Sequence, residues 1–334
     1  MTITIRPAGL SDLDPLADLL LADAESRCAL RPDLWKLDKA PRQRILNSVK
    51  AAMEADNPPF RQQWLVAEAD RRIVGVTHSI LLPVPPIYAG KFGPPGLIME
   101  DCHIAADAPP DTRSLLFQAA AADLTKAGAR ILLASSVEGG EWEAEYARQG
   151  LKPLTMYFAK TGLSNASAFT DVRHALVKDV PAIVASSAVN RQILKDLHPL
   201  FWKPHDAADS RFGAWMTRSL TLNDRDMSVA ETAGRVRGYA ISQPATALHF
   251  PAPHDISNVG VIDDFFHEEL VDARELQAGG IKSATLFEAA EAARGRRGNA
   301  SVLVVCPAAW ASKITLLKNA GYSNAITWFI KTPD

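Results

Sequence analysis

Two short stretches of the chain carry residues whose types and spacing could do chemistry. Asp263 and Asp264 are neighbours in a mostly apolar segment, where a carboxylate can act as a general base. Gln277 opens the second stretch, and Gly279 and Gly280 follow directly before a helical segment. Paired glycines permit a tight turn whose backbone N–H groups, with a helix N-terminus behind them, bind phosphate oxygens. The two stretches therefore predict an anion site near a candidate base.

The acidic residues and the nearby histidine each allow a second interpretation. Successive side chains of a strand point to opposite faces, so we expect only one of Asp263 and Asp264 to face a cleft. The alternative is one solvated aspartate and one hydrogen-bonded structural aspartate. Glu231, on the preceding predicted strand, is a second candidate base. His267 ends the acidic strand, where it could titrate near neutrality or lie in a surface loop.

The chain also contains a duplication. Matching segments recur at offsets of 163 to 171 residues: Trp64–Gly75 with Met227–Gly238, Ile98–Asp101 with Val261–Asp264, and Gly150 with Gly321. A length of 334 residues suits two domains of about 150 to 200 residues each. We therefore predict an N-terminal domain over 1–163 and a C-terminal domain over 169–334, joined by a linker rich in Ser, Asn and Ala.

Apolar periodicity predicts the same order of elements, β-α-α-β-β-β-α-β-α-β, in both halves. The expected strands are 2–6, 64–69, 72–82, 97–105, 130–136 and 153–161, then 170–177, 227–232, 235–243, 259–267, 300–306 and 324–331. The expected helices are one beginning at Ser11, then 41–55, 113–127, 140–149, 179–195, 209–220, 281–294 and 308–319. This alternation predicts the α/β class (α+β), with a mixed central sheet flanked by helices in each half.

With these residues in place, the chain resembles the GNAT family of acyl-CoA-dependent N-acetyltransferases. The family's pyrophosphate loop runs Gln or Arg, two residues, Gly, one residue, then Gly or Ala; Gln277 and Gly280 match, and Lys282 replaces the last small residue. The resemblance covers both halves and implies the acyl-CoA N-acyltransferase fold, acetyl-CoA as cofactor and an amine as acceptor. The implied cofactor-binding residues are Phe265, His267, Gln277, Ala278, Gly279, Gly280, Ile281, Lys282 and Ser283.

The two copies differ at the positions that matter for this chemistry. In the first half, the loop position reads Asp107–Thr112, with no glycine, two prolines that lack N–H donors and two aspartates that repel phosphate. We therefore expect acyl-CoA to bind, and chemistry to occur, in the C-terminal copy. The family's tyrosine before the last strand is instead present only in the first half, as Tyr146, whereas Leu317 stands in the second.

Several of these residues have alternative roles. Tyr146 is either a catalytic acid or an aromatic packed on a helix. Cys306, Tyr322 or solvent could replace the missing acid in the second half, and Cys306 could equally be a buried small residue. Phe201 and Trp202 could line an acceptor pocket or belong to the core. The departures at Lys282 and Leu317 also keep open a non-catalytic protein, acting as an acyl-CoA or small-ligand sensor or as an interaction module.

Composition limits the partners. A net charge of −2 gives no basis for binding nucleic acid or an anionic membrane, so we expect a small-molecule or peptide amine as partner. The cysteines are odd in number and widely spaced, which argues against a disulfide framework and a zinc site, and we expect no metal. No signal-like or membrane-length apolar run stands out, so we expect a cytoplasmic protein.

Overall fold

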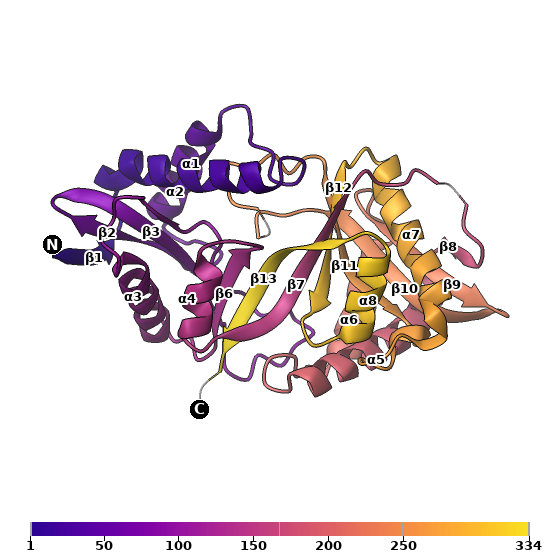
Figure 1. The fold of residues 1–334 in the computed structure, drawn as a ribbon. Coiled ribbons are helices and arrows are strands. Elements are labelled where there is room, and N and C mark those ends of the chain that lie inside the picture. The colour runs from indigo at the N-terminus through magenta and orange to yellow at the C-terminus, as the bar shows by residue number, and fades with distance from the viewer. Residues whose placement is uncertain (1, 167, 249, 333–334) are drawn as a thin grey trace.

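Two sets of elements follow one another in the same order in the computed structural model, which describes residues 2–166, 168–248 and 250–332 (Figure 1). The first set comprises β1 (Ile3–Pro7), α1 (Leu13–Leu30), α2 (Pro41–Glu54), β2 (Gln62–Ala69), β3 (Arg72–Leu81), β4 (Gly96–Ile98), β5 (His103–Ile104), α3 (Thr112–Lys126), β6 (Leu132–Val137), α4 (Trp142–Arg148) and β7 (Lys152–Thr161). The second comprises β8 (Val172–His174), α5 (Val180–Leu197), α6 (Ala208–Ser219), β9 (Asp226–Thr232), β10 (Arg235–Pro244), β11 (Val259–His267), α7 (Ile281–Arg296), β12 (Ser301–Pro307), α8 (Ala311–Asn319) and β13 (Ser323–Lys331).

Two predicted strands are wrong in their extent. The expected strand over 170–177 shortens to β8, and a short 3-10 helix begins at Val177. The expected strand over 97–105 divides into β4 and β5, with Met99–Cys102 between them. Two carbonyls in this stretch bond to side chains instead of continuing the ladder: that of Met99 accepts from the thiol of Cys102, and that of Cys102 accepts from the indole of Trp142 at 3.1 Å. The corresponding β11 of the second half stays continuous.

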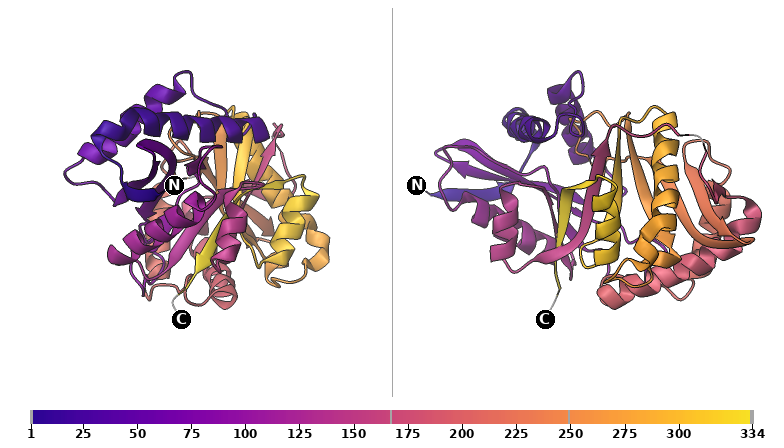
Figure 2. Two further views of the ribbon diagram at one scale, coloured as in Figure 1. Left: turned by 60° about the vertical axis from the view of Figure 1, so that its left-hand side comes forward. Right: turned by 45° about the vertical axis from the view of Figure 1, so that its right-hand side comes forward.

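Helices cover both faces of the sheet, as the alternation predicted (Figure 2). Neighbouring residues of β2 show why, because they contact different helices. Val66 packs in a cluster with Leu16 of α1, whereas Leu65 packs in a cluster with Leu116 of α3. Adjacent side chains of a strand point to opposite faces, so α1 and α3 lie on opposite sides of the sheet.

A single sheet runs through the molecule, and the two halves exchange their last strands. The strand order is β1-β2-β3-β4-β6-β13-β7-β12-β11-β10-β9-β8, with β5 beside β3. Thus β13, the last strand of the chain, lies between β6 and β7, and β7 pairs with β12 of the second half (Figure 1). Only β4–β6 and β11–β12 are parallel among the described pairs. The predicted domain limits at 163 and 169 fall in the connection between β7 and β8 and stay a prediction.

A loop of the first half also packs against the second half. The connection between β3 and β4 reaches the segment between α5 and α6, where Tyr88 and Pro204 form an isolated β-bridge. The guanidinium of Arg211 donates to the carbonyl of Pro86 at 2.8 Å. This loop therefore forms part of the surroundings of any site in the second half.

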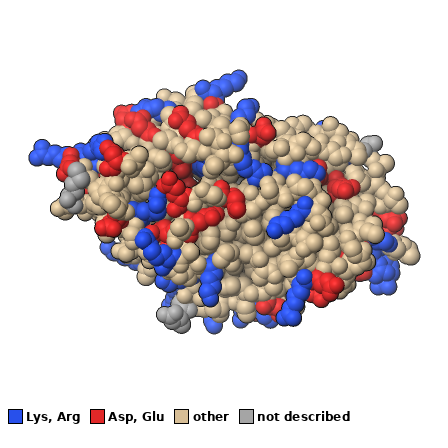
Figure 3. All heavy atoms as spheres, in the orientation of Figure 1, with Lys and Arg blue, Asp and Glu red and all other residues tan. Residues whose placement is uncertain are grey.

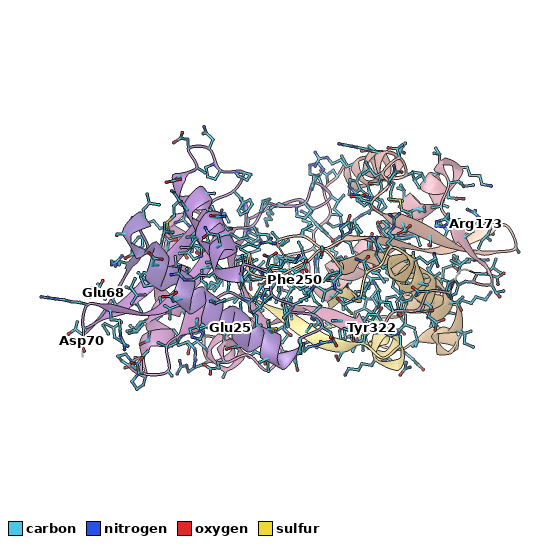
Figure 4. The ribbon with its side chains drawn as sticks, turned by 90° about the horizontal axis from the view of Figure 1, so that it is seen from above. Glu25, Glu68, Asp70, Arg173, Phe250 and Tyr322 are labelled. Carbon is cyan, nitrogen blue, oxygen red and sulfur yellow. The ribbon has the colours of Figure 1, made fainter. Side chains whose placement is uncertain are left out.

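A loop of the second half contacts the first half in the corresponding place. The connection between β10 and β11 reaches the segment between α1 and α2, where Leu37 and His254 form the corresponding bridge. Phe250 of this connection packs on Trp35, with ring centroids 4.9 Å apart. Figure 4 shows Phe250 near the junction of the halves. Each half thus covers part of the other.

On the face shown in Figure 3, acidic side chains gather left of the centre, and basic side chains are scattered around them. No helix within the described residues is long and apolar enough to cross a membrane. The same residues contain no group of three or more His, Cys, Asp or Glu side chains placed to hold a metal ion. All three cysteines, Cys28, Cys102 and Cys306, are free thiols.

Candidate active site

A cavity opens in the second half where β11 and β12 part. The strands pair in parallel from Val259–Ile262 against Ser301–Val304, and the ladder ends there. The cavity has a volume of about 520 Å³, a size that suits a small ligand. Its walls come from β10, β11, β12, α5, α6, α8 and the β3–β4 connection of the first half.

Asp263 and Asp264 both line this cavity, which corrects the expectation that only one of them would face a cleft. The reason is a β-bulge in β11. Ile241 of β10 pairs with Asp264 and Ser242 pairs with Ile262, so that Asp263 is an extra residue in the strand. A bulge interrupts the alternation of side chains and can turn two neighbours to one side. The bulge therefore brings two carboxylates into one site.

The two carboxylates have different partners. Asp264 accepts hydrogen bonds from Asn190 Nδ2 at 3.0 Å and from the hydroxyl of Tyr239 at 2.7 Å. Burial raises the pKa of Asp264, and the charge of Lys313 opposes that rise. Asp263 accepts from Gln243 Nε2 at 3.2 Å and is otherwise open to the cavity. Desolvation by the cavity walls, together with the charge of Asp264, raises the pKa of Asp263 to about 6.

Lys313 on α8 completes the group, and sequence reasoning missed it. Its side chain lines the cavity and is buried, with Nζ 4.3 Å from the ring centroid of Trp310 and 5.7 Å from that of Phe265. Burial lowers the pKa of Lys313, and the charge of Asp264 works against that change. A signal existed in the sequence, because Lys313 shares a helix face with the buried residues Leu316 and Leu317.

The remaining walls are aromatic and cationic. Burial raises the pKa of Tyr88, which comes from the first half, so its hydroxyl stays protonated. Arg191 donates to Ser187 Oγ at 2.5 Å and pairs with Asp209. Trp202 lines this cavity, and Phe201 lines a neighbouring one of about 380 Å³, so the structure leaves both acceptor contact and packing open for them. The other aromatic and cationic residues of the lining are Arg211, Phe212, Trp215 and Arg225.

The glycine-containing loop forms the backbone arrangement that the sequence predicted for an anion. Ala278, Gly279 and Gly280 are three successive residues in the left-handed region, with φ of 49°, 66° and 69°, directly before α7. A Cβ on Gly280 would lie 2.7 Å from the Leu276 side chain, whereas the space beside Gly279 is open. Consecutive residues of this kind turn backbone N–H groups towards one side, in front of the positive end of the helix dipole.

An internal carboxylate already uses part of this helix start. Glu269 Oε2 accepts from the backbone N–H of Ser283 at 2.8 Å. Lys282 points elsewhere, because its Nζ donates to Thr232 Oγ1 at 3.1 Å. The backbone conformation of the loop thus suits an anionic group, and the Glu269 contact shows that this helix start accepts one. Residues Gln277, Ala278, Gly279, Gly280, Ile281 and Ser283 could hold a phosphate group there.

Three other candidate residues lie apart from the loop or have structural partners. Phe265 lines the cavity and packs on Phe287, with ring centroids 5.3 Å apart. His267 is buried, which lowers the pKa of its imidazole, and its Nδ1 accepts from the N–H of Glu269 at 3.2 Å. Glu231 pairs with Arg173 at 2.5 Å, in the same arrangement as Glu68 with Arg6 in the first half, and does not line the cavity of Asp263.

Aromatic side chains gather at the equivalent place in the first half. Tyr146 is fully buried there, and its hydroxyl donates to the carbonyl of Ser135 at 3.4 Å. Its ring lies beside Trp142, whose indole bonds across to Cys102. Burial raises the pKa of Glu100, in the same stretch, to about 7. The structure therefore does not bring Tyr146 together with the carboxylates of the second half.

Comparisons with known proteins identify the fold. No protein-family model matches the chain, and no curated protein matches it by sequence. A tandem GNAT protein from the clavulanic acid biosynthesis pathway superposes with a TM-score of 0.50 over 100% of both chains, at 13% identity. A GCN5-related N-acetyltransferase from Sphaerobacter thermophilus superposes with a TM-score of 0.56 over 98% of this chain and 95% of that one, also at 13% identity. The chain therefore has the fold of tandem GNAT proteins, and the predicted fold class is confirmed.

Proposed function

We propose that this protein is an N-acyltransferase that moves an acetyl or other acyl group from acyl-CoA to an amine, with the chemistry in the C-terminal half. The observation that carries the proposal is the position of Asp263, at the parting of β11 and β12 and open to a cavity of about 520 Å³. The tandem GNAT fold supports it, because GCN5-related N-acetyltransferases are among the proteins that share the fold.

Asp263 is the general base. A carboxyl with a pKa of about 6 is ionised at neutral pH and still accepts a proton better than an ordinary aspartate. Asp264 is held by Asn190 and Tyr239, so it orients the cavity wall and keeps the pKa of Asp263 raised. Lys313 is the general acid, since a lysine whose pKa is lowered gives up a proton more readily than an exposed one.

Acyl-CoA supplies the acyl group as a thioester when it is bound. The loop from Gln277 to Ser283 holds its phosphates through backbone N–H groups at the start of α7. Glu269 has to release the N–H of Ser283 for a phosphate oxygen to take the same position. The proposed anion site and candidate base thus lie on β11 and the segment that follows it.

The acceptor is an amine that also carries an anionic group. Three arginines, Arg191, Arg211 and Arg225, line the cavity together with the two aspartates. The aspartates favour the amino end of such a molecule, and the guanidinium groups favour a carboxylate or phosphate at its other end. We therefore expect amino acids and similar zwitterions to be better acceptors than simple amines.

Calorimetric titration of acetyl-CoA into a matched pair of variants tests the proposal. Gly279 has open space beside it and positive φ, a conformation that Asn and Asp tolerate. Gly279→Asp places a carboxylate in the anion site and should abolish binding, whereas Gly279→Asn should bind like wild type. Pro110→Ala in the first half should also leave binding unchanged. Failure of wild type to bind acetyl-CoA would contradict the proposal.

A second candidate function is ligand binding without turnover. Two contacts favour it. Glu269 accepts a hydrogen bond from the backbone N–H of Ser283. The indole of Trp310 donates to the carbonyl of Leu270 at 3.2 Å and so joins the start of α8 to the segment after β11. Both contacts hold the segment after β11 and the start of α7 in place within the chain. Acetyl-CoA binding without acetylation of any amine in a broad amino-acid panel would favour this function over catalysis.

A further inference from the structure

The first half contains a cavity of its own, separate from the site of Asp263. It measures about 800 Å³ and lies against α1, α2, β2 and β3. The connection between β10 and β11 closes it from the second half, with Thr246, Leu248 and Pro251 in its wall. Leu20, Ile45 and Ile80 supply much of its apolar surface. A cavity of this size can enclose a metabolite.

A stacked pair of rings brings two nitrogens without partners to this cavity. Trp64 and His78 both line it, and their rings stack with centroids 4.3 Å apart. His78 Nδ1 lies 2.9 Å and 3.0 Å from the two carboxylate oxygens of Asp101. Trp64 Nε1 and His78 Nε2 are buried and find no hydrogen-bond partner among the residues that the structure describes. Buried polar groups in folded proteins are nearly always paired, so these two point to a missing partner.

An arginine with unused donors lies at the same cavity. Arg27 on α1 lines it and is only 2% exposed. Its Nη2 pairs with Asp23, and its guanidinium lies 5.7 Å from the ring centroid of Trp35. Its Nε and Nη1 have no partner within the described part of the chain. A buried guanidinium with free N–H groups matches a carboxylate in charge and in hydrogen bonding.

We propose that this first-half cavity binds a carboxylate-bearing metabolite with an apolar body, held at its acid end by Arg27 and Trp64 beside the His78–Asp101 pair. The apolar body would lie along Leu20, Ile45 and Ile80. Arg27 and Trp64 supply only donors, which is why an anion suits them better than a neutral ligand.

The ligand is bound there, not acylated. The first half carries the Asp107–Thr112 loop, in which Asp107 pairs with Arg72 and no glycine is present. The proposal therefore stands independently of the acyltransferase proposed for the second half.

The indole N–H of Trp64 reports on the site directly. We would label the full chain with ¹⁵N-tryptophan, assign Trp64 with a Trp64→Phe variant, and titrate benzoate, 3-phenylpropanoate and octanoate, each beside its primary amide. At least one acid should shift the Trp64 resonance and bind at least tenfold more tightly than its amide. Equal binding of acid and amide, or no shift with any acid at millimolar concentration, would overturn the proposal.

Matched variants locate the ligand. Trp64→Phe keeps an aromatic ring beside His78 but removes the five-membered ring that carries the N–H, so the acid's affinity should fall about tenfold, as for one hydrogen bond to a charged group. Trp215→Phe, in the other cavity, should leave affinity unchanged. Loss of affinity in Trp215→Phe with none in Trp64→Phe would place the ligand in the second half and overturn the proposal. Arg27→Gln should lower the affinity for the acid and leave the affinity for the amide unchanged. If this variant does not fold, the result for Trp64→Phe decides.

Discussion

At the scale of single residues, the bulge at Asp263 determines the chemistry that the second half can perform. Without it, Asp263 and Asp264 would point to opposite faces of β11. With it, one carboxylate is tied to Asn190 and Tyr239, and the other is open to the cavity with a raised pKa. Unequal environments for two neighbouring acids are a common way to separate a reacting group from a supporting one.

Replacement of the candidate base, Asp263, should strongly lower the rate of acyl transfer. Asp263→Asn keeps the shape of the side chain and removes its ability to accept a proton, so kcat/KM for the best amine should fall roughly 100- to 10,000-fold. Steady-state kinetics over pH 5–9 would measure it. In the wild type, activity should fall as the pH drops below about 6, because Asp263 becomes protonated. A variant with full activity would assign the base elsewhere.

Lys313 should influence the same pH profile through Asp264. Its positive charge favours the ionised form of Asp264, and the charge of Asp264 raises the pKa of Asp263. Lys313→Met should therefore leave Asp264 more protonated, lower the pKa of Asp263 and move the acid limb of the profile below pH 6, besides lowering kcat. An acid limb that stays in place or moves upward would contradict this coupling.

At the scale of elements, the exchange of β7 and β13 joins the two cores. Phe329 of β13 belongs to the sequence of the second half, but its ring lies 5.7 Å from that of Tyr146 in the core of the first. Phe158 of β7 shows the reverse, because it is buried in the core of the second half. Each half of the sheet therefore contains one strand that belongs to the other half of the sequence.

This exchange predicts where a core mutation acts. Phe329→Ala should lower the free energy of unfolding by about 3–5 kcal/mol, as expected for a buried aromatic. Hydrogen exchange should then speed up first in β6 and α4 of the first half. The matched variant Phe158→Ala should instead expose β12 and its neighbours. Increased exchange confined to the half that carries the mutation would contradict the shared cores.

At the scale of the whole molecule, the halves cover one another's cavities. The β3–β4 connection brings Tyr88 to the cavity of the second half, and the β10–β11 connection brings Thr246 and Leu248 to the cavity of the first. The pseudo-symmetric bridges at Pro204 and Leu37 anchor these two loops. Neither cavity is complete within one repeat.

Separate halves should therefore not fold independently. Fragments 1–163 and 169–334, produced alone, should lack cooperative thermal unfolding, because each would miss one strand and one covering loop. Produced together, they should form a complex that unfolds near the temperature of the intact chain. A dispersed NMR spectrum from either fragment alone would contradict this prediction.

Local patterns in the sequence determined a large part of this outcome. The duplication, the order of strands and helices, and the contrast between the Gln277–Gly280 loop and the Asp107–Thr112 loop all follow from periodicity, turn residues and missing N–H groups. These properties act over a few residues, so they can be read along the chain. The positive φ values at Ala278, Gly279 and Gly280 agree with that prediction.

The tertiary structure decided what depends on residues far apart in the chain. The strand exchange, the crossing loops and the approach of Lys313 to Asp264 involve contacts between distant segments, for which no local pattern exists. The bulge at Asp263 depends on register with β10, and the unpaired donors of Arg27 and Trp64 depend on burial by α1, β2 and β3. Because pairing and burial are properties of the folded molecule, only its three-dimensional arrangement shows which carboxylate is open to the cavity and where a second ligand can bind.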